Sequence, residues 1–169
     1  PSNKVDALLE DIAKGDYAAA TGVIVFAQSK PLLQLLSATM EDKKIAHGLI
    51  VGGMSSGDRD KVIDGFQAGE FPFVLVSVAA GGTGLTLTRA DTMVYIQRPW
   101  SSILMDQSLA RAHRIGSEVH ESIRRVDYVS EGTIESKQIK ALAGKSARIA
   151  EILRDDEALR LFLTEKDDV

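Results

Sequence analysis

The amino-acid sequence predicts an α/β fold, a three-layer arrangement in which helices cover both faces of a parallel sheet. Short runs of β-branched and aromatic residues alternate with segments whose apolar residues recur at helical spacing, which is typical of repeated strand–helix units. The strand runs are continuously apolar, as expected for strands buried on both faces. Glycines and clustered polar residues follow directly after these runs. In parallel sheets this is where ligands bind, at the carboxyl ends of the strands.

The first half of the chain alternates helix and strand patterns. Its expected elements are a helix over residues 2–13, a strand over 23–26, a helix over 31–40, a strand over 45–51 and a helix over 55–67. Ser2 can cap the first helix, and Ser55 or Ser56 can cap the third. Pro31 is tolerated because it falls in the first turn of its helix. The second strand ends at a pair of glycines, which favours a turn there.

The second half continues the alternation. Its expected elements are strands over residues 73–76, 93–96 and 122–129, a helix over 106–115, a long helix over 133–153 and a short helix over 156–163. A glycine-rich turn over residues 79–84 follows the first of these strands. The charged end of the chain is expected to fray. We therefore expect one domain over residues 1–153, followed by a short helix and acidic tail over residues 154–169.

Composition restricts the cellular settings and the kinds of site that are expected for this chain. The 169 residues include no cysteine, which excludes disulfides and thiolate metal sites and favours a reducing, intracellular setting. The three histidines lack metal-ligand spacing, so no metal site is expected. No apolar run reaches the length of a membrane span, and no membrane partner is expected. The chain begins at Pro1 without an initiator methionine, so we expect a piece of a longer protein.

The negative charge is concentrated at one end of the chain. Residues 151–169 hold seven acidic and three basic residues, which accounts for the whole net charge of −4 and leaves residues 1–150 neutral. A phosphate-binding surface must therefore be a local patch. Five arginines between residues 98 and 125 supply one candidate patch.

Two of these arginines lie in the segment of residues 106–116. Arg111 and Arg114 are three positions apart and Gln107 is four positions before Arg111, so on a helix the three side chains share one side. Arginine forks on a rigid element suit a phosphate chain, where they can neutralise charge during phosphoryl transfer. On spacing alone, a solvated helix face is the more common explanation.

The glycine-rich turn also has two interpretations. Gly81, Gly82 and Gly84 follow a buried strand, where backbone N–H groups could approach a phosphate or ribose closely. An ordinary strand–helix turn would have the same composition. The turn lacks the glycine spacing of a dinucleotide-binding fold.

Six segments, taken together, resemble the motifs of one protein family. They are residues 23–28 (VIVFAQ), 52–66, 77–87 (SVAAGGTGLTL), 97–100 (QRPW), 106–116 (DQSLARAHRIG) and 132–135 (GTIE). In this order they are similar to the motifs of the C-terminal RecA-like lobe of superfamily 2 helicases, specifically the Swi/Snf-type DNA translocases. The resemblance covers about residues 2–153, and the segment 106–116 is its most specific part. The chain departs from the family pattern at Val78, Ala79, Arg98, Thr86 and Ser117.

The resemblance implies a RecA-like fold and half of an ATP-driven motor. It implies that Arg111 and Arg114 are arginine fingers, with Gln107 hydrogen-bonding nearby, and that Gly82 and Gly84 lie near the nucleotide. Residues implied to contact a nucleic-acid backbone are Gln28, Ser29, Lys30, Arg59 and Thr83. The implied cofactors are ATP and Mg²⁺, held mainly by an N-terminal RecA-like lobe of the same protein. The implied partner is DNA, expected to be double-stranded, in an intracellular, DNA-associated protein.

The sequence also predicts that this chain alone is inactive. It contains no Walker A loop and no acidic box for magnesium, and hydrolysis needs both. Residues 144–146 (GKS) resemble the end of a Walker A loop, but Ile139 stands where its first glycine is needed. Two other functions stay open, namely a helicase lobe acting on RNA or single strands and a non-catalytic RecA-like interaction module. A Rossmann-type cofactor enzyme is disfavoured by the missing fingerprint.

Overall fold

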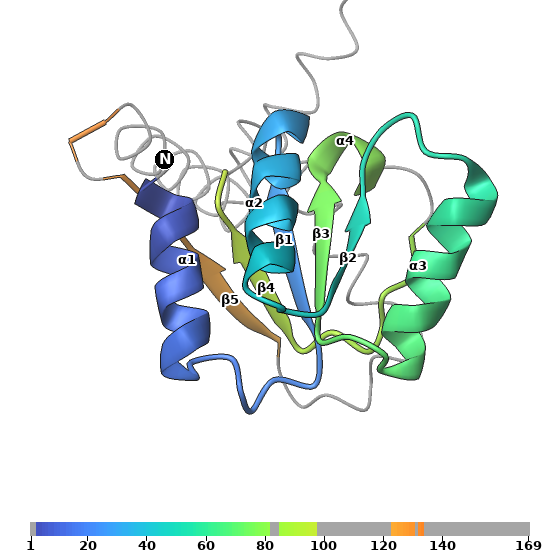
Figure 1. Ribbon diagram of the computed structural model, residues 1–169, viewed down its shortest axis with the longest axis horizontal. Helices are drawn as coiled ribbons and strands as arrows, with labels where there is room; N and C mark the ends of the chain where they lie inside the picture. The colour runs from blue at the N-terminus through green and yellow to red at the C-terminus, as the bar shows by residue number, and fades with distance from the viewer. Residues whose placement is uncertain (1–2, 82–84, 98–122, 131, 134–169) are drawn as a thin grey trace, which may run out of the picture. The chain divides into compact units, whose positions relative to one another are not determined.

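The computed structural model of the chain describes residues 3–81, 85–97, 123–130 and 132–133 (Figure 1). The chain divides into two compact units, residues 1–129 and residues 130–169. The elements described below all belong to the first unit. Among the described residues, no helix has the length and apolar character needed to cross a membrane.

The described strands form one parallel sheet. They are β1 (Val23–Ala27), β2 (His47–Ile50), β3 (Phe73–Ser77), β4 (Thr92–Tyr95) and β5 (Arg124–Asp127). Their order across the sheet is β2-β3-β1-β4-β5, and every pair of neighbours is parallel. All carboxyl ends therefore lie along one edge, uppermost in Figure 1, which we call the carboxyl edge; the opposite side is the amino edge. Beyond β1 the chain first winds toward β2 and β3 and then crosses to β4, so the winding direction changes beside β1.

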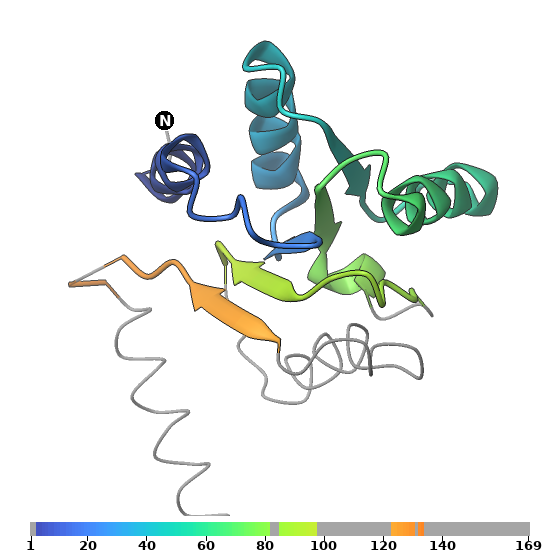
Figure 2. The same cartoon turned by 90° about the horizontal axis from the view of Figure 1, so that it is seen from below.

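Helices cover both faces of the sheet. On one face, α1 (Asn3–Lys14) and α2 (Lys30–Asp42) bury most of their leucines against the side chains of Val23, Val25 and Leu75. On the other face, α3 (Ser56–Ala68) and the short α4 (Val78–Gly81) pack with Ile24, Phe26 and their neighbours. Figure 2 shows α1 and α2 on one side of the sheet and α4 on the other. The predicted three-layer α/β fold is confirmed.

Local sequence signals explain where the helices begin and end. The Ser29 side chain caps α2 by accepting a hydrogen bond from Leu32 N, and Ser55 caps α3 in the same way through Asp58 N. At the end of α3, Gly69 takes a left-handed conformation with φ 81°, which only glycine adopts without strain. All five residues of β1 are buried, because both faces of this central strand are covered.

Most predicted elements of the first unit are confirmed, with small shifts at their ends. The strand expected over residues 45–51 is limited to His47–Ile50, and the strand expected over 122–129 is limited to Arg124–Asp127. The turn expected over residues 79–84 begins instead as the helical turn α4. The helices expected over residues 106–115, 133–153 and 156–163 lie outside the described residues. The expected domain boundary at residue 153 also lies there and stays a prediction.

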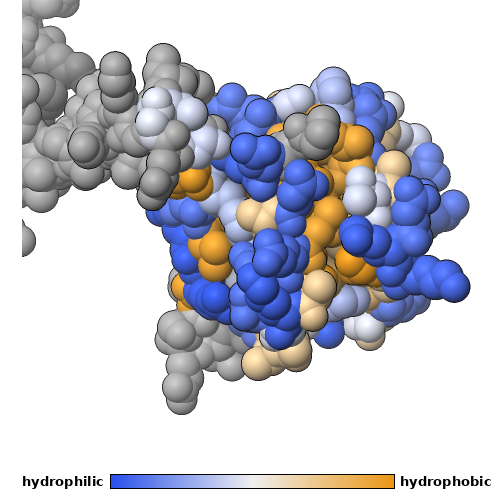
Figure 3. All heavy atoms as spheres, turned by 60° about the vertical axis from the view of Figure 1, so that its left-hand side comes forward, coloured by the Kyte–Doolittle hydropathy of each residue, from blue (hydrophilic) through white to orange (hydrophobic). Residues whose placement is uncertain are grey.

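The described surface is mixed in character. Figure 3 shows hydrophilic residues over much of the face it presents, with smaller hydrophobic areas between them. Among the described residues, the large hydrophobic side chains that are exposed are Leu35 and Val129. Leu35 lies on α2 and Val129 lies beyond the end of β5, and single exposed residues of this kind indicate no binding surface.

Candidate functional site

The candidate site is the carboxyl edge of the sheet, where the chain leaves four strands in succession. The described exits of these four strands are residues 28–30 after β1, 51–55 after β2, 78–81 after β3 and 96–97 after β4. Since the chain changes its winding direction beside β1, this is the part of the edge where a parallel sheet most readily holds a ligand. The predicted nucleic-acid contacts Gln28, Ser29 and Lys30 lie here.

These three residues form the tight connection between β1 and α2, which we call the β1–α2 corner. Ser29 is fixed by three hydrogen bonds. Its hydroxyl accepts from Leu32 N at 3.3 Å and its carbonyl accepts from Leu33 N at 3.2 Å. Its backbone N–H donates to Oε1 of Gln97, at the exit of β4, at 2.9 Å. The corner is therefore held rigidly, while the side chains of Gln28 and Lys30 are exposed.

Lys30 connects two strand exits. Its Nζ donates to the carbonyl oxygen of Gly52, just beyond β2, at 3.1 Å. The following Gly53 has a φ of 90°, a conformation that favours glycine, so the backbone at this exit turns sharply. An ammonium group has three donors, and one bond to a carbonyl leaves others for an anion. The positive charge of Lys30 thus lies at the carboxyl edge, where α2 begins, and the N-terminus of this helix adds positive electrostatic potential.

Arg59 lies at the end of the first turn of α3, the helix that follows the exit of β2. The residue is half-buried and its backbone N–H donates to the carbonyl of Ser55 at 3.1 Å. Ser55 both caps the helix and donates its hydroxyl to the Asp58 carboxylate at 2.7 Å. The start of α3 is thereby fixed at the carboxyl edge, and Arg59 lies on the helix next to the exit that Lys30 contacts.

The exit of β3 carries the start of the glycine-rich segment. Ser77 is buried and its hydroxyl accepts a hydrogen bond from Ala80 N at 3.3 Å, which stabilises the turn of α4. Val78 and Ala80 are buried while Ala79 is exposed. The predicted nucleotide or nucleic-acid residues Gly82, Thr83 and Gly84 lie outside the described residues.

The predicted catalytic residues also lie outside the described residues. They are Gln107, Arg111 and Arg114. Their roles as arginine fingers and as a supporting amide stay predictions. The structure thus brings together one predicted group, the β1–α2 corner, and places Arg59 on the adjoining helix.

Two residues at this edge were not predicted as site residues. Gln97 binds the β1–α2 corner, and Lys4 donates through Nζ to the carbonyl of Ile96 at 3.1 Å. The sequence signal for Gln97 was its place at the end of a buried strand. Lys4 gave no signal, because its contact joins residues 92 positions apart.

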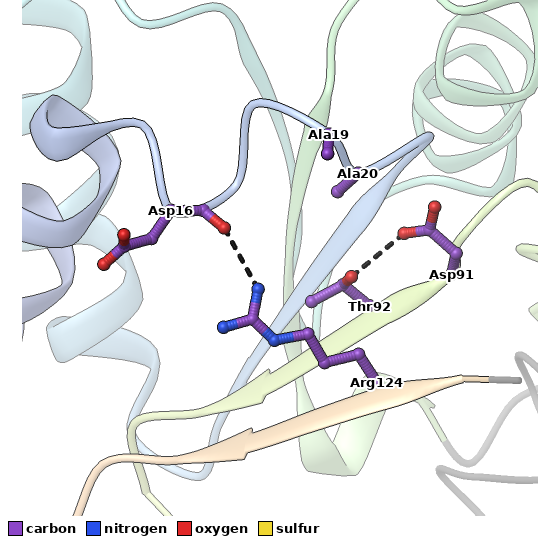
Figure 4. Close-up of a pocket in the computed structure, with 6 residues that line it drawn as sticks. All are labelled: Asp16, Ala19, Ala20, Asp91, Thr92 and Arg124. Carbon is purple, nitrogen blue, oxygen red and sulfur yellow. Dashed lines mark hydrogen bonds between the residues drawn. The ribbon is translucent and has the colours of Figure 1, made fainter.

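A separate hollow lies at the amino edge. Its volume is about 230 Å³, and it is lined by Asp16, Ala19, Ala20, Asp91, Thr92 and Arg124 (Figure 4). Nη1 of Arg124 donates to the Asp16 carbonyl at 3.0 Å, and the Thr92 hydroxyl donates to the Asp91 carboxylate at 2.9 Å. The other Asp91 oxygen accepts from Thr21 N at 2.6 Å. These bonds tie the loop before β1 to the starts of β4 and β5, which is a structural role.

A parallel sheet of this order, covered on both faces, with glycine and polar residues at one edge, defines a doubly wound α/β domain with its candidate ligand site at the carboxyl edge. Comparison with known families identifies it further. The family of helicase conserved C-terminal domains matches residues 3–116, and the chain belongs to this family. The predicted resemblance to the C-terminal lobe of Swi/Snf-type superfamily 2 proteins is confirmed.

Three relatives illustrate the similarity. The chain is 31% identical over 157 residues to the DNA repair protein RAD5A of Arabidopsis thaliana, which covers 92% of this chain and 15% of that protein. It is 31% identical over 115 residues to the putative ATP-dependent helicase/translocase YwqA of Bacillus subtilis, covering 68% of this chain and 12% of that protein. It is 26% identical over 158 residues to the chromatin-remodeling ATPase INO80 of Vanderwaltozyma polyspora, covering 93% of this chain and 10% of that protein. The chain thus spans a small part of the length of the curated relatives it matches.

The fold has a counterpart among solved structures. The crystal structure of the C-terminal part of the Fun30 ATPase domain superposes with a TM-score of 0.73 at 23% sequence identity, covering 82% of this chain and 44% of that chain. At this identity the likeness supports the RecA-like fold, and the family assignment rests on the sequence matches.

Proposed function

We propose that this chain works as the C-terminal motor lobe of an ATP-dependent DNA translocase and supplies arginine fingers to an ATP bound in the cleft with an N-terminal lobe. The observation that carries the proposal is the extent of the family match. It runs from residue 3 to residue 116 and so includes the whole segment DQSLARAHRIG at residues 106–116. This segment supplies the two arginines and the glutamine that such a motor needs.

In the proposed reaction, Arg111 and Arg114 approach the phosphate chain of ATP and stabilise the charge that develops on the transferred phosphoryl group. An arginine finger contributes about 10³–10⁵ in rate in comparable enzymes. Gln107 donates or accepts a hydrogen bond nearby, and Gly82 and Gly84 allow close approach of the backbone to the nucleotide. Mg²⁺ and most of the ATP contacts belong to the N-terminal lobe.

The proposed DNA contact is made at the β1–α2 corner. Gln28 and Lys30 are exposed there, and the backbone under them is fixed by the bonds of Ser29. Arg59 and Thr83 are the further proposed contacts. Contacts of this kind go to phosphates, so they position the duplex without reading its sequence. A lobe that is neutral over residues 1–150 binds DNA weakly, which suits a motor that must release and rebind at each step.

The direct test is Arg114→Ala in the complete protein. We expect DNA-stimulated ATP hydrolysis to fall by about 10³-fold or more, with the thermal unfolding temperature unchanged. Lys14→Ala is the control, because Lys14 is an exposed cation at the end of α1 whose ion pair with Glu10 at 2.9 Å lies within one helix and contributes little to stability. Wild-type turnover in Arg114→Ala would exclude the finger role.

ATPase measurements on the complete protein also distinguish the two alternative functions, a lobe acting on RNA or single strands and an interaction module. Stimulation of the ATPase by duplex DNA, single-stranded DNA and RNA is compared at equal nucleotide concentration. We expect duplex DNA to stimulate most. Stronger stimulation by RNA or single strands would favour a helicase lobe for those substrates, and no nucleic-acid effect together with an active Arg114→Ala variant would favour an interaction module.

A further inference from the structure

Gln97 lies two residues beyond the end of β4. Its side chain adds one more hydrogen bond between the β4 side and the β1 side of the sheet. The two strands pair in register from Val23 with Thr92 to Phe26 with Tyr95. The next bond of the ladder runs from Ile96 N to the Phe26 carbonyl at 3.1 Å. Beyond this point the β1 chain turns into α2, and the Gln97 side chain reaches across to Ser29 N at 2.9 Å.

The chemistry of this bond fixes the orientation of the amide. Ser29 N–H is a donor, so it must meet the Oε1 acceptor of Gln97 and not its Nε2. The half-buried side chain of Gln97 is therefore held by one defined contact. A glutamate would offer the same acceptor, whereas a methionine of similar length would offer none of comparable strength.

The bond links two parts of the carboxyl edge that have different proposed tasks. On one side is the β1–α2 corner, where the exposed Gln28 and Lys30 are proposed to meet DNA phosphates. On the other side is the strand exit from which the chain continues to the segment of residues 106–116, beginning nine positions after Gln97. Lys4 holds the same exit through the Ile96 carbonyl, so the exit moves little relative to the sheet.

We propose that Gln97 is a positioning residue that couples DNA contact at the β1–α2 corner to ATP hydrolysis. The inference rests on the proposed function of the chain. A phosphate bound at the corner loads the rigid bond between Ser29 N and Oε1 of Gln97, and this bond holds the exit of β4, from which the chain continues to residues 106–116. Without this bond, DNA still binds the corner, but bound DNA stimulates ATP hydrolysis less.

The test uses three variants of the complete protein. Gln97→Met removes the acceptor, and Gln97→Glu keeps it. The control is Gln67→Met, since Gln67 also accepts a backbone N–H, that of Arg89 at 3.0 Å, and in addition donates to the Thr88 hydroxyl at 2.9 Å, but at the end of α3 near the amino edge. For each variant, ATP hydrolysis is measured without DNA and over a series of duplex DNA concentrations, which separates the maximal stimulated rate from the DNA concentration at half-stimulation.

We expect Gln97→Met to lower the maximal stimulated rate about fivefold to tenfold while the rate without DNA stays at the wild-type value. Gln97→Glu is expected to restore the maximal rate to within about twofold, although its charge raises the DNA concentration needed, an effect that salt screens. Gln67→Met is expected to leave both rates unchanged.

Three results would overturn the coupling role. They are a wild-type maximal rate in Gln97→Met, a loss that Gln97→Glu does not restore, and a parallel fall of the rates with and without DNA, which would indicate general loss of structure. The failure of the proposed function is recognised separately, because the wild-type protein would then show no DNA stimulation at all.

Discussion

Gly48 is a residue of β2 that lies in close contact with side chains of α3 and of the segment that follows it. A Cβ built on it would lie 2.5 Å from Cγ1 of Val62 and 2.8 Å from Cε2 of Phe71. Such distances are well inside van der Waals contact, so any larger residue must displace its neighbours. The absence of a side chain at this position is what allows α3 to lie directly on the edge strand.

Gly48→Ala should therefore destabilise the fold by about 1–3 kcal/mol. Gly57→Ala is the matched control, because a Cβ there meets no atom within 4 Å. As a replacement within a helix, it should be neutral or stabilising by up to about 1 kcal/mol. Urea denaturation measures both free energies, and equal stability of the two variants would contradict the close contact at Gly48.

At the scale of elements, α1 is attached to the end of β5 by a chain of hydroxyl groups. The Tyr128 hydroxyl donates to the Asp11 carboxylate on α1 and lies 3.0 Å from the hydroxyl of Tyr17. Burial raises the pKa of Tyr128, and its hydrogen bond to Asp11 raises it further. Burial likewise raises the pKa of Tyr17. The contact joins residues 117 positions apart and so fixes the first helix to the last strand of this unit.

Tyr128→Phe should lower the free energy of unfolding at pH 7 by about 1–3 kcal/mol, because the carboxylate loses its donor. It should also change the dependence on pH. In the wild type the unfolded phenol loses its proton above about pH 10 while the folded one retains it, so stability falls as the pH rises beyond that value.

Without the Tyr128 hydroxyl this fall should be shallower, and the remainder should come from Tyr17. Urea midpoints at pH 8, 10 and 11 measure the difference. Identical slopes for the variant and the wild type would show that the Tyr128 proton is held no more tightly in the folded state than in the unfolded one.

At the scale of the whole molecule, the fold was predictable because burial on both faces leaves a clear mark on a strand. The apolar runs of β1 and β3 indicated central parallel strands, and the structure pairs the two. The ends of β2 and β5 were less predictable, since outer strands are more exposed and their pattern is weaker. The turn after β3 begins with a helical turn because Ser77 stabilises it, a contact that composition does not reveal.

For the candidate site, the sequence predicted which residues lie at the carboxyl edge, but it did not predict contacts that depend on the order of the strands. Parallel strands alone place the polar residues after β1 at the same edge as the glycines after β2. The hydrogen bond from Lys30 to Gly52 agrees with this placement. The partnership of Ser29 with Gln97 depends on β4 lying beside β1. Strand order is a tertiary property with no local signal, so residues 68 positions apart could not be paired from the sequence.

The division of the proposed motor into two lobes leads to the last prediction. The sequence contains no Walker A loop and no acidic box, so the proposed fingers act on a nucleotide that another lobe holds. The isolated chain should therefore show ATP hydrolysis near background, with or without duplex DNA, whereas the complete protein should show DNA-stimulated turnover. A preparation of the isolated chain carrying Arg114→Ala is the control, since any contaminating ATPase would be equal in both. Substantial DNA-dependent hydrolysis by the isolated chain that Arg114→Ala removes would contradict the two-lobe arrangement, because the chain would then hold and cleave the nucleotide by itself.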